Sequence, residues 1–369
     1  MKIGFHSPLP PDRTGVADYS AALLAALKPL GQVEVNARDA AIHLYHLGNN
    51  RLHAGIYRRA LEQPGIVVLH DAVLHHFLLG TLTEQEYIEE FTYNYGTWHQ
   101  DLARQLWRNR SRSATDPQYF RYPLLKRVAE RSLAVIVHNP GAERMVERHA
   151  PGTAVYEIPH LFEPPREMPA VPDVLRLRQA LGIAPRTFLF GIFGHLRESK
   201  RLLSVLRSFE RVRHAAPMAL LVAGNFVSSD LERAAAPLLR ANRGVLRVGF
   251  MPEPAFWRYA AATDACINLR YPAAGETSGI SIRLMGTGKP VIMTAGLETS
   301  RFPECAALRV DAGLAEEAML SEFMLLLAQS PADAEAIGHR SAAYIHERHE
   351  PGRVAREFWR VLNDCYHKN

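Results

Sequence analysis

The stretch NLRYPAAGETSGISIRLMGTGKPV, Asn268–Val291, contains the signals of one parallel α/β unit. An apolar run ends at Asn268, a loop with Pro and Gly follows, and an amphipathic run then leads to Gly-Lys-Pro and a second apolar run. This order is typical of a strand, a crossover helix and a parallel strand. Thr277, Ser278 and Gly279 stand where the helix should begin, so its free N–H groups would face an anion there.

The same alternation of short apolar runs and helical patterns continues along the whole chain. Uninterrupted apolar strands between helices are typical of parallel sheets that helices cover on both faces. The expected strands are residues 2–7, 32–36, 41–48, 65–71, 133–139, 154–159, 188–195, 219–225, 246–250, 264–270, 290–294 and 307–311.

The length of the chain predicts two domains. Its 369 residues exceed the roughly 250–300 that one hydrophobic core organises. A proline-rich stretch, Glu163–Val174, has the composition of a linker. We therefore expect an α/β fold of two Rossmann-like, doubly wound domains, residues 1–165 and 166–351, that face each other across a cleft. A helical pattern at 352–369 would pack back on the first domain and complete it.

Composition excludes several classes of protein. The chain is 47% hydrophobic and 22% charged with a net charge of +5, and it has no basic block or aromatic RNA-binding signature, so we expect no nucleic-acid partner. Its apolar runs are too short for a membrane span or a signal peptide. Cys266, Cys305 and Cys365 form no CxxC pair, which favours a reducing compartment without disulfides. The expected location is the cytoplasm.

A long region without an expected strand, residues 83–131, is aromatic and basic. In one interpretation it binds an acceptor or faces a membrane, with Trp98, Trp107, Arg108, Arg110 and Arg112 meeting lipid headgroups. In the other it is a helical subdomain with buried aromatic residues and a solvated basic face, which is the commoner meaning of such a charge run.

Polar residues follow many of the expected strands, where doubly wound sheets bind their ligands. Common fingerprints are missing: no GxGxxG follows the first strand, Gly286–Pro290 is not a P-loop, and no zinc spacing or Asp-x-Asp pair occurs. We therefore expect no cofactor and no bound metal. The strand ends in question carry His6-Ser7, His70-Asp71, His138-Asn139, Gly194-His195, Gly224-Asn225 and Asn268-Leu269-Arg270.

What remains is a metal-free anion site. His195, Arg197 and Lys200 follow the first strand of the second domain, and together with the helix start at Thr277–Gly279 they could neutralise a diphosphate. Taken alone, Glu-Thr-Ser-Gly would be an ordinary N-cap. The cations at a neighbouring strand end favour the phosphate site.

These motifs resemble those of nucleotide-sugar glycosyltransferases of the GT-B fold, and above all retaining glycosyltransferase family 4. The resemblance covers essentially the whole chain and is most specific in VGFMPEPAFWRYAAATDACINL and GETSGISIRLMGTGKPVI; it extends to GVADYS, LHD, VHN, GHLRESKRL and VAGN. It implies retaining, metal-independent transfer of a hexose from a nucleoside-diphosphate sugar, with UDP or GDP, to a glycan, lipid-linked or small-molecule acceptor. The nucleotide sugar is then a co-substrate.

The resemblance also implies roles for single residues. Lys200 would bind the donor diphosphate, His195 takes the place of a family arginine, and Arg197 would substitute for it. Glu276 would bind hydroxyls of the sugar, because a carboxylate beside phosphates would be repelled, and His70 a hydroxyl of the donor sugar or acceptor. The family's second glutamate is missing, since its position falls on Leu284 or Arg283. Further donor contacts are expected from Asn225, Arg270, Thr277, Ser278 and Gly279, and acceptor-side contacts from Gly15, Asp18, Tyr19, Asp71 and His138.

Asp71 has two interpretations, as a polar partner of His70 or as the cap of the next helix. Two other functions also stay open: a nucleotide-sugar epimerase on the same fold, and a non-catalytic subunit that binds a nucleotide sugar. A lipid-linked acceptor would bring the protein into peripheral contact with the inner face of the membrane.

Overall fold

The computed structural model describes residues 1–12 and 14–368. By its internal contacts the chain divides into two compact units. Unit 1 comprises Met1–Leu161, Pro272–Gly279 and Arg348–Asn369, and unit 2 comprises Phe162–Tyr271 and Ile280–Glu347. The first boundary lies a few residues before the expected one. The assignment of residues 272–279 to unit 1 differs from the expected domains, which placed this loop in the second one.

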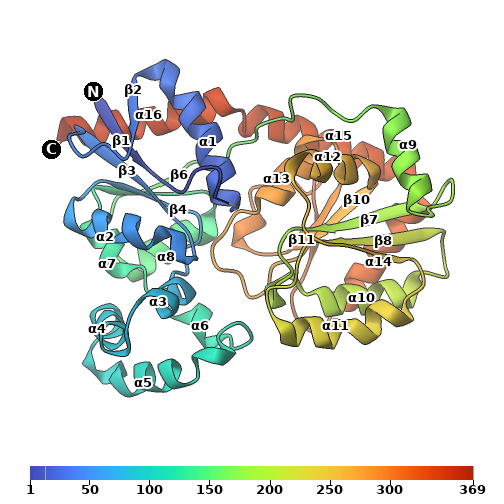
Figure 1. The fold of residues 1–369 in the computed structure, drawn as a ribbon, viewed down its shortest axis with the longest axis horizontal. Helices are drawn as coiled ribbons and strands as arrows, with labels where there is room; N and C mark the ends of the chain where they lie inside the picture. Colours follow the sequence, from blue (N-terminus) through green and yellow to red (C-terminus); the bar gives the residue numbers. More distant parts are fainter. Residues whose placement is uncertain (13, 369) are drawn as a thin grey trace. The chain divides into compact units, whose positions relative to one another are not determined.

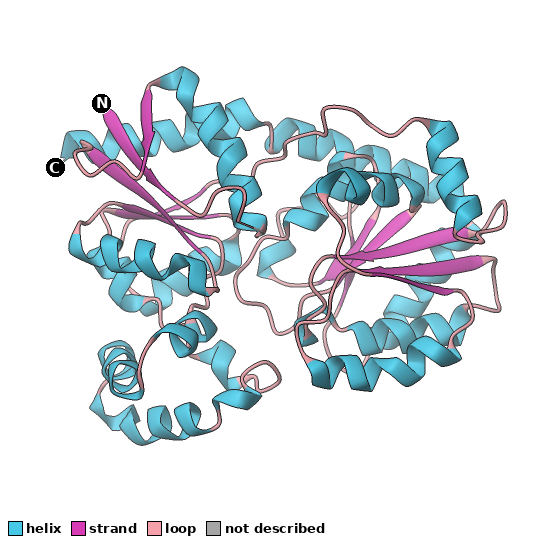
Figure 2. Cartoon of the chain, in the orientation of Figure 1, coloured by secondary structure: helices cyan, strands magenta, loops and turns pink. Residues whose placement is uncertain are grey.

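Each unit contains one six-stranded parallel sheet between helices, as expected for Rossmann-like domains (Figures 1 and 2). Every one of the expected strand ranges overlaps a strand. The sheet of unit 1 has the order β2-β1-β3-β4-β5-β6 and that of unit 2 the order β12-β11-β10-β7-β8-β9. The strands are β1 Lys2–His6, β2 Gln32–Val35, β3 Ile42–Leu47, β4 Ile66–Leu69, β5 Ala134–Val137, β6 Val155–Glu157, β7 Phe188–Phe193, β8 Met218–Ala223, β9 Val245–Val248, β10 Ala265–Asn268, β11 Val291–Thr294 and β12 Leu308–Val310.

Helices cover both faces of the sheet in unit 1, because alternate strand residues are apolar on either side. Ile3, Phe5 and Leu44 pack against α1 and the C-terminal helix α16, where Phe358 is fully buried. Tyr45 and Leu47 point to the other face. The helices of this unit are α1 Gly15–Leu27, α2 Ala54–Glu62, α3 His75–Thr81, α4 Glu84–Tyr95, α5 Gln100–Arg108, α6 Gln118–Arg121, α7 Lys126–Arg131, α8 Pro140–His149 and α16 Pro351–Lys368.

Unit 2 is built in the same way. Phe190 and Ile192 of β7 pack against α10 and α14 on one face, and Leu189 and Phe193 pack against α12 and α13 on the other. The helices are α9 Val171–Ala180, α10 Leu202–Val212, α11 Ser229–Ala241, α12 Glu253–Ala262, α13 Gly279–Gly286, α14 Glu316–Gln329 and α15 Pro331–Arg348, of which α13 begins and α15 ends on a residue that belongs to unit 1.

The region 83–131 is helical, in agreement with one of its two interpretations, and it extends unit 1 (Figure 1). Helix α4 begins with a capping box in which Thr83 and Glu86 exchange hydrogen bonds. Tyr87, Phe91 and Tyr119 are fully buried in the core of the unit. The expectation of buried aromatic residues is confirmed for these three, whereas the Trp98 side chain is 96% exposed.

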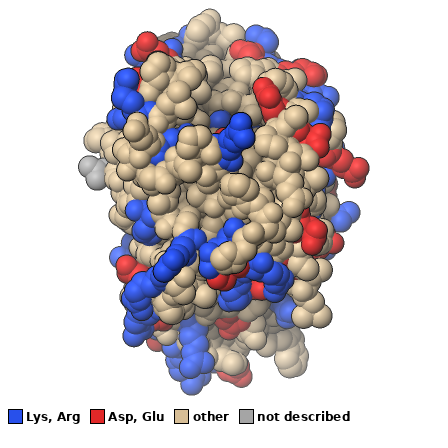
Figure 3. Space-filling model, turned by 90° about the vertical axis from the view of Figure 1, so that its right-hand side faces the viewer, with Lys and Arg blue, Asp and Glu red and all other residues tan. Residues whose placement is uncertain are grey.

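Charged groups of both signs are spread over the face of the molecule drawn in Figure 3. On this face, many Lys and Arg side chains (blue) lie beside one another or beside Asp and Glu (red). Several are paired, as in Arg213 with Glu210 and Arg207 with Glu317. Among the helices that the structure describes, none is long and apolar enough to cross a membrane.

Candidate functional site

The strand order in the sheet of unit 2 reverses between β7 and β10. Strands β8 and β9 are added on one side of β7, and β10 to β12 are added on the other side. Such a switch point opens a crevice at the carboxyl ends of the two strands, where ligands bind. Lys200 follows β7 in a short 3₁₀ helix, Glu198–Lys200, and Arg270 follows β10. The two loops are joined by a hydrogen bond from Tyr271 N–H to the Ser199 carbonyl (2.8 Å). Lys200 and Arg270 therefore lie in neighbouring loops at the carboxyl ends of these two strands.

Lys200 is a buried cation. Its side chain is 4% exposed, and its Nζ donates to the Phe193 carbonyl. Gly194 makes room for it: φ is +86°, and an added Cβ would lie 3.3 Å from Nζ. No ion pair joins Lys200 to a carboxylate anywhere in residues 1–12 and 14–368. A buried ammonium without a counter-ion is costly, so an anionic ligand would gain strongly from it.

The electrostatics of this cluster favour an anion. Burial lowers the pKa of Lys200 well below 10.5, and the nearby Arg270 and Arg197 lower it further. The pKa of His195 is lowered by partial burial and by the same neighbours, Arg197 and Lys200. His195, Arg197, Lys200 and Arg270 thus act on one another, as cations held close together do. A diphosphate would relieve this repulsion.

Two asparagines predicted from the strand ends shape the loops of unit 2. Asn225 Oδ1 accepts a hydrogen bond from Phe250 N–H (2.9 Å), and its carbonyl accepts from Leu196 N–H (2.9 Å). Asn268 Nδ2 donates to Ser281 Oγ (2.6 Å). These contacts join the loops after β7, β8 and β9 and attach β10 to α13. Asn225 therefore holds together the loops that form the predicted donor site.

The loop Pro272–Gly279 packs on the strand ends of unit 1. Asn139 Nδ2 donates to the Gly275 carbonyl (2.9 Å) and to Thr277 Oγ1 (2.9 Å). Thr277 Oγ1 donates to the His138 carbonyl (3.2 Å). Gly275 has φ +72°, and an added Cβ would lie 2.7 Å from the Cβ of Ala72. Only glycine meets both demands, so this motif residue is needed for docking the loop.

Glu276 lies in this docked loop. Its Oε2 accepts a hydrogen bond from Ala274 N–H (2.7 Å), and the Ala274 carbonyl accepts from the N–H groups of Ala72 (2.8 Å) and Val73 (3.0 Å). The carboxylate is therefore oriented by the loop that carries it. Helix α13 begins at Gly279, so Thr277 and Ser278 directly precede its first turn, as the sequence predicted.

Four aromatic rings of unit 1 form one cluster beside this loop. Tyr19 of α1 lies 4.8 Å from His70, 5.2 Å from His138 and 4.6 Å from His160, measured between ring centroids. His138 Nδ1–H donates to the Ile158 carbonyl (2.9 Å), which leaves a lone pair on Nε2. Tyr19 OH and His138 Nε2 are enclosed without a hydrogen-bond partner among the described residues. His160 lies next to Gly279, where an added Cβ would be 3.5 Å from Nε2.

Burial keeps the imidazoles of His70 and His138 neutral. It lowers the pKa of His70 well below 6.5, and the neighbouring histidines lower it further. The pKa of His138 falls to about 4, mainly by burial. A neutral imidazole can donate one hydrogen bond and accept another, which suits the recognition of hydroxyl groups. The cluster is therefore suited to bind the hydroxyl groups of a polyol and poorly suited to bind an anion.

His70 has a partner, His46, that no sequence motif predicts. Its Nε2 lies 3.0 Å from Nδ1 of His46, which is fully buried in β3. The register places His46 opposite Val68, two residues before His70. Asp71 Oδ2 accepts from Asn49 N–H (2.8 Å), and the helix that follows has Leu74 at its N-cap. The interpretation of Asp71 as the cap of that helix is therefore wrong.

The remaining acceptor-side predictions fall on the start of α1. Gly15 is its first residue, and among the described atoms nothing lies within 4 Å of an added Cβ there. Asp18 is in the first turn, and Thr14 caps the helix by accepting from Ala17 N–H (3.1 Å). The structure thus brings Tyr19, His70 and His138 into one cluster and places Gly15 at an open position on the same helix.

Neither position aligned with the missing glutamate supplies a carboxylate. Leu284 is fully buried in the core of unit 2. Arg283 pairs with Glu253 of α12 and stacks over Phe256 and Trp257, with 4.3 Å and 4.4 Å from its guanidinium carbon to the ring centroids. Glu253 is therefore the carboxylate found beside this part of α13, a neighbour that the sequence pattern did not reveal.

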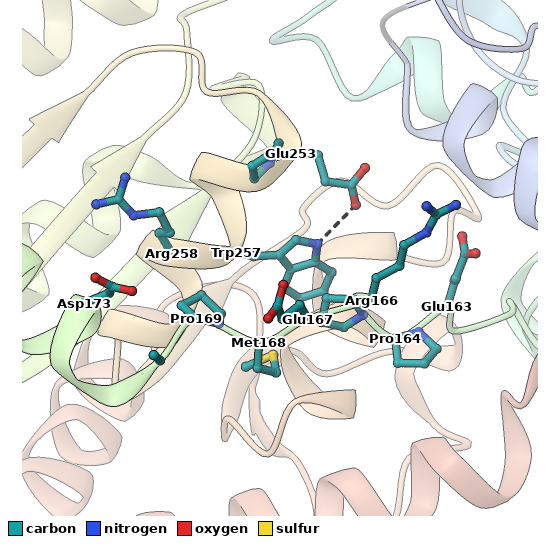
Figure 4. A pocket seen from close by; sticks show the side chains of 13 residues that line it. Glu163, Pro164, Arg166, Glu167, Met168, Pro169, Asp173, Glu253, Trp257 and Arg258 are labelled. Carbon is teal, nitrogen blue, oxygen red and sulfur yellow. Dashed lines mark hydrogen bonds between the residues drawn. The ribbon is translucent and has the colours of Figure 1, made fainter.

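A pocket of about 810 Å³ lies in unit 2 between the linker and α12 (Figure 4). Trp257 forms one wall, and its Nε1–H donates to Glu253 Oε1 (3.2 Å). Met168 and Arg258 line it as well. None of the residues predicted for the donor or the acceptor lines this pocket. Within the described residues, no group of three or more His, Cys, Asp and Glu side chains could hold a metal ion.

The chain has the GT-B fold of nucleotide-sugar glycosyltransferases. Its structure is similar to sucrose-phosphate synthase from Thermosynechococcus elongatus (TM-score 0.70, 15% identity, 100% of both chains). It is also similar to HepE from Anabaena in complex with UDP-glucose (TM-score 0.66, 15% identity, 99% of this chain and 100% of that one). The catalytic domain of starch synthase IV from Arabidopsis thaliana, bound to ADP and acarbose, gives a TM-score of 0.63 at 13% identity, covering 99% of both chains. No protein-family model and no curated protein matches the sequence.

Proposed function

We propose that the protein is a retaining glycosyltransferase, resembling family 4, that transfers a hexose from a nucleoside-diphosphate sugar. The observation that carries this proposal is the buried Lys200, which lies without a carboxylate ion pair among the described residues at the switch point of unit 2. A diphosphate is the anion expected there, because similar structures hold UDP, UDP-glucose or ADP. UDP-glucose is accordingly the first donor to test.

The proposed roles follow the chemistry of each unit. In unit 2, Lys200, Arg197 and Arg270 bind the diphosphate, and the sequence has no Asp-x-Asp pair to recruit a metal for that task. In unit 1, Glu276 and His70 bind hydroxyls of the transferred sugar. Tyr19 and His138 add neutral donors and acceptors to the same cluster. The cations thus serve the leaving group, and the Glu276 carboxylate and the neutral side chains of unit 1 serve the sugar.

The proposed mechanism places little covalent chemistry on the protein. The bond between the anomeric carbon and the leaving phosphate breaks, and the acceptor hydroxyl attacks the same face of the sugar. Its proton passes to the leaving diphosphate. The protein orients the two reactants and stabilises the charge that develops on the leaving group, and these are large contributions to catalysis.

Replacement of Glu276 by glutamine separates sugar transfer from nucleotide binding. We expect transfer from UDP-glucose to fall by about 100-fold or more, as for other preorganised polar contacts in active sites. The affinity for free UDP should change by less than about threefold, because the new amide side chain keeps an oxygen that accepts from Ala274 N–H. Transfer is followed by release of UDP in the presence of an acceptor panel, and binding by calorimetry.

The control for this experiment is Glu304→Gln, which removes an exposed carboxylate elsewhere in the chain. Equal losses of binding and transfer in Glu276→Gln would contradict the division of roles. Tight nucleotide binding by the unaltered protein with no turnover on any acceptor would support a binding subunit instead. A changed configuration of the sugar in UDP-glucose without an acceptor would support an epimerase.

For the acceptor we propose a lipid-linked glycan at an anionic membrane surface. Helix α5 presents Arg104 and Arg108 outward, Arg110 and Arg112 follow it, and the Trp98 side chain just before it is 96% exposed. Arginines with an exposed indole are suited to phospholipid headgroups. The helix is too short and polar to enter the bilayer, so the contact would be peripheral.

Binding to vesicles tests this surface. The triple variant Arg108→Gln, Arg110→Gln, Arg112→Gln should bind phosphatidylglycerol vesicles about 100-fold more weakly, since each basic residue near an anionic surface contributes about 1 kcal/mol. A matched triple variant at Arg233, Arg240 and Arg243 removes the same charge from exposed positions in unit 2. Equal vesicle binding by both variants in a sedimentation assay would contradict the proposal.

A further inference from the structure

The strongest unexplained feature of unit 1 is a pair of buried histidines. His46 Nδ1 and His70 Nε2 lie 3.0 Å apart, so a single proton joins the two rings when both are neutral. His46 is completely buried, and its Nε2 has no hydrogen-bond partner among the described residues. Its ring also lies 4.7 Å from that of Phe5, between centroids. Because His46 Nε2 has no partner among the described residues, the surroundings of His46 decide whether the shared proton is bound to His46 Nδ1 or to His70 Nε2.

Two arrangements of the proton can be compared. If His70 Nε2–H were the donor, the neutral His46 would carry its proton on Nε2, a buried N–H without an acceptor. If His46 Nδ1–H is the donor, His46 Nε2 carries only a lone pair. Buried N–H groups without acceptors are rarer in proteins than under-satisfied acceptors. The second arrangement is therefore favoured, and His70 must then carry its own proton on Nδ1.

We infer that His46 is a positioning residue that holds His70 in the Nδ1–H tautomer, so that His70 meets the substrate as a hydrogen-bond donor. The inference rests on the proposed function for the substrate, but the tautomer itself is a property of the free protein. A donor at this place would bind a hydroxyl oxygen of the sugar and would not remove a proton from the acceptor. His46 thus acts through His70 without touching the substrate.

The surroundings of His70 keep it in this neutral form. Burial lowers its pKa, and protonation is further opposed by its histidine neighbours. Each of these neighbours is itself held neutral or lies close enough to repel a second positive charge. The titratable groups that face His70 come from five elements or their ends: Tyr19, His46, His53, His138 and His160.

The test is a nitrogen-15 NMR spectrum of the ligand-free protein labelled on histidine, with His70 assigned by comparison with His70→Gln. From pH 6.5 to 8, we expect the shifts of a protonated Nδ1 and an unprotonated Nε2 for His70, and the opposite result would overturn the inference. The measurement needs no substrate. A protein that binds nucleotide but lacks transferase activity would refute the proposed function and leave the tautomer standing.

Two variants of His46 extend the test. His46→Phe keeps the ring but removes the donor, whereas His46→Asn places an amide N–H near the former Nδ1. We expect His46→Phe to shift the His70 proton toward Nε2 and to lower kcat by about 10- to 100-fold with a KM for the donor that changes little, as for other residues that orient a functional histidine. His46→Asn should restore kcat to within about threefold. If Asn is as impaired as Phe while both fold, His46 has only a packing role.

Discussion

Replacement of Lys200 by methionine is expected to weaken binding of a nucleoside diphosphate by about 2–5 kcal/mol, which is a loss of about 30-fold or more in affinity. The reason is that Lys200 is buried and forms no carboxylate ion pair within the described residues, so its charge is available to the ligand. Methionine has a similar length and keeps the packing. Calorimetry with UDP measures the change directly.

The same substitution should stabilise the ligand-free protein. Burying an ammonium without a counter-ion costs folding free energy, which methionine removes, so we expect the free energy of unfolding to rise by about 1–2 kcal/mol. Part of the gain is lost because the Phe193 carbonyl gives up its donor. Opposite changes in binding and in stability are typical of a residue kept for a ligand. Urea unfolding of both proteins measures the difference.

Lys289 provides the matched control. It is also a lysine of unit 2 with a pKa lowered by burial, but it precedes β11 at the other edge of the sheet and donates to the carbonyls of Ala261 (3.2 Å) and Thr263 (2.6 Å). Lys289→Met should leave nucleotide affinity unchanged. If Lys200→Met binds UDP as tightly as the unaltered protein, the diphosphate site lies elsewhere.

Unit 1 is expected to unfold in mild acid because its buried histidines must remain neutral. The pKa values of His53 and His138 are about 4 in the folded protein, against an ordinary value of 6.5. Below pH 6.5 the unfolded chain therefore binds more protons than the folded one, and stability falls as the pH falls toward 4. Below about pH 4, His53 and His138 are protonated in the folded protein as well. The stability then falls no further on their account.

The expected effect is large. The difference between 6.5 and about 4 corresponds to about 3 kcal/mol for each of the two histidines. Together they approach the whole stability of a typical domain, about 5–15 kcal/mol. At neutral pH the penalty is absent, since the histidines are neutral in both states. We therefore expect the loss of tertiary structure in unit 1 between pH 6 and 4.

Tryptophan fluorescence can follow unit 1 separately. In the variant Trp257→Phe the remaining tryptophans, Trp98, Trp107 and Trp359, all belong to unit 1. His138→Asn keeps a donor toward the Ile158 carbonyl and should reduce the pH dependence of the free energy of unfolding by about 1.4 kcal/mol per pH unit between pH 6 and 4. The exposed His367→Asn is the control. Equal pH dependence in both variants would refute this account.

The elements of the fold could be predicted from the sequence because their signals are local. Many strands are short apolar runs, such as Phe188–Phe193, and helices such as α1 have their own cap and apolar face. A parallel sheet buries both faces of its strands, and the uninterrupted apolar runs follow from that alone. The region 83–131 lacks such runs, and a helical subdomain was one of its two interpretations.

The candidate site was only partly predictable. Lys200 and Arg270 were found because the carboxyl ends of parallel strands meet at one edge, so polar residues after different strands are brought together. Glu276 was found from a motif. His46 was missed, because it lies inside a strand pattern and its partner His70 is 24 residues away. No periodicity in the sequence connects two such positions.

Local chemistry in the sequence therefore determined the two parallel sheets, their helices and the polar strand ends, since strands, caps and turns depend on neighbouring residues. Only the tertiary structure decided that the loop Pro272–Gly279, which lies between two strands of unit 2, docks on unit 1. It also decided that Lys200 is buried and that His46 meets His70. These contacts join residues far apart in the chain. They depend on how the helices and strands pack together, and not on the conformational preferences of neighbouring residues.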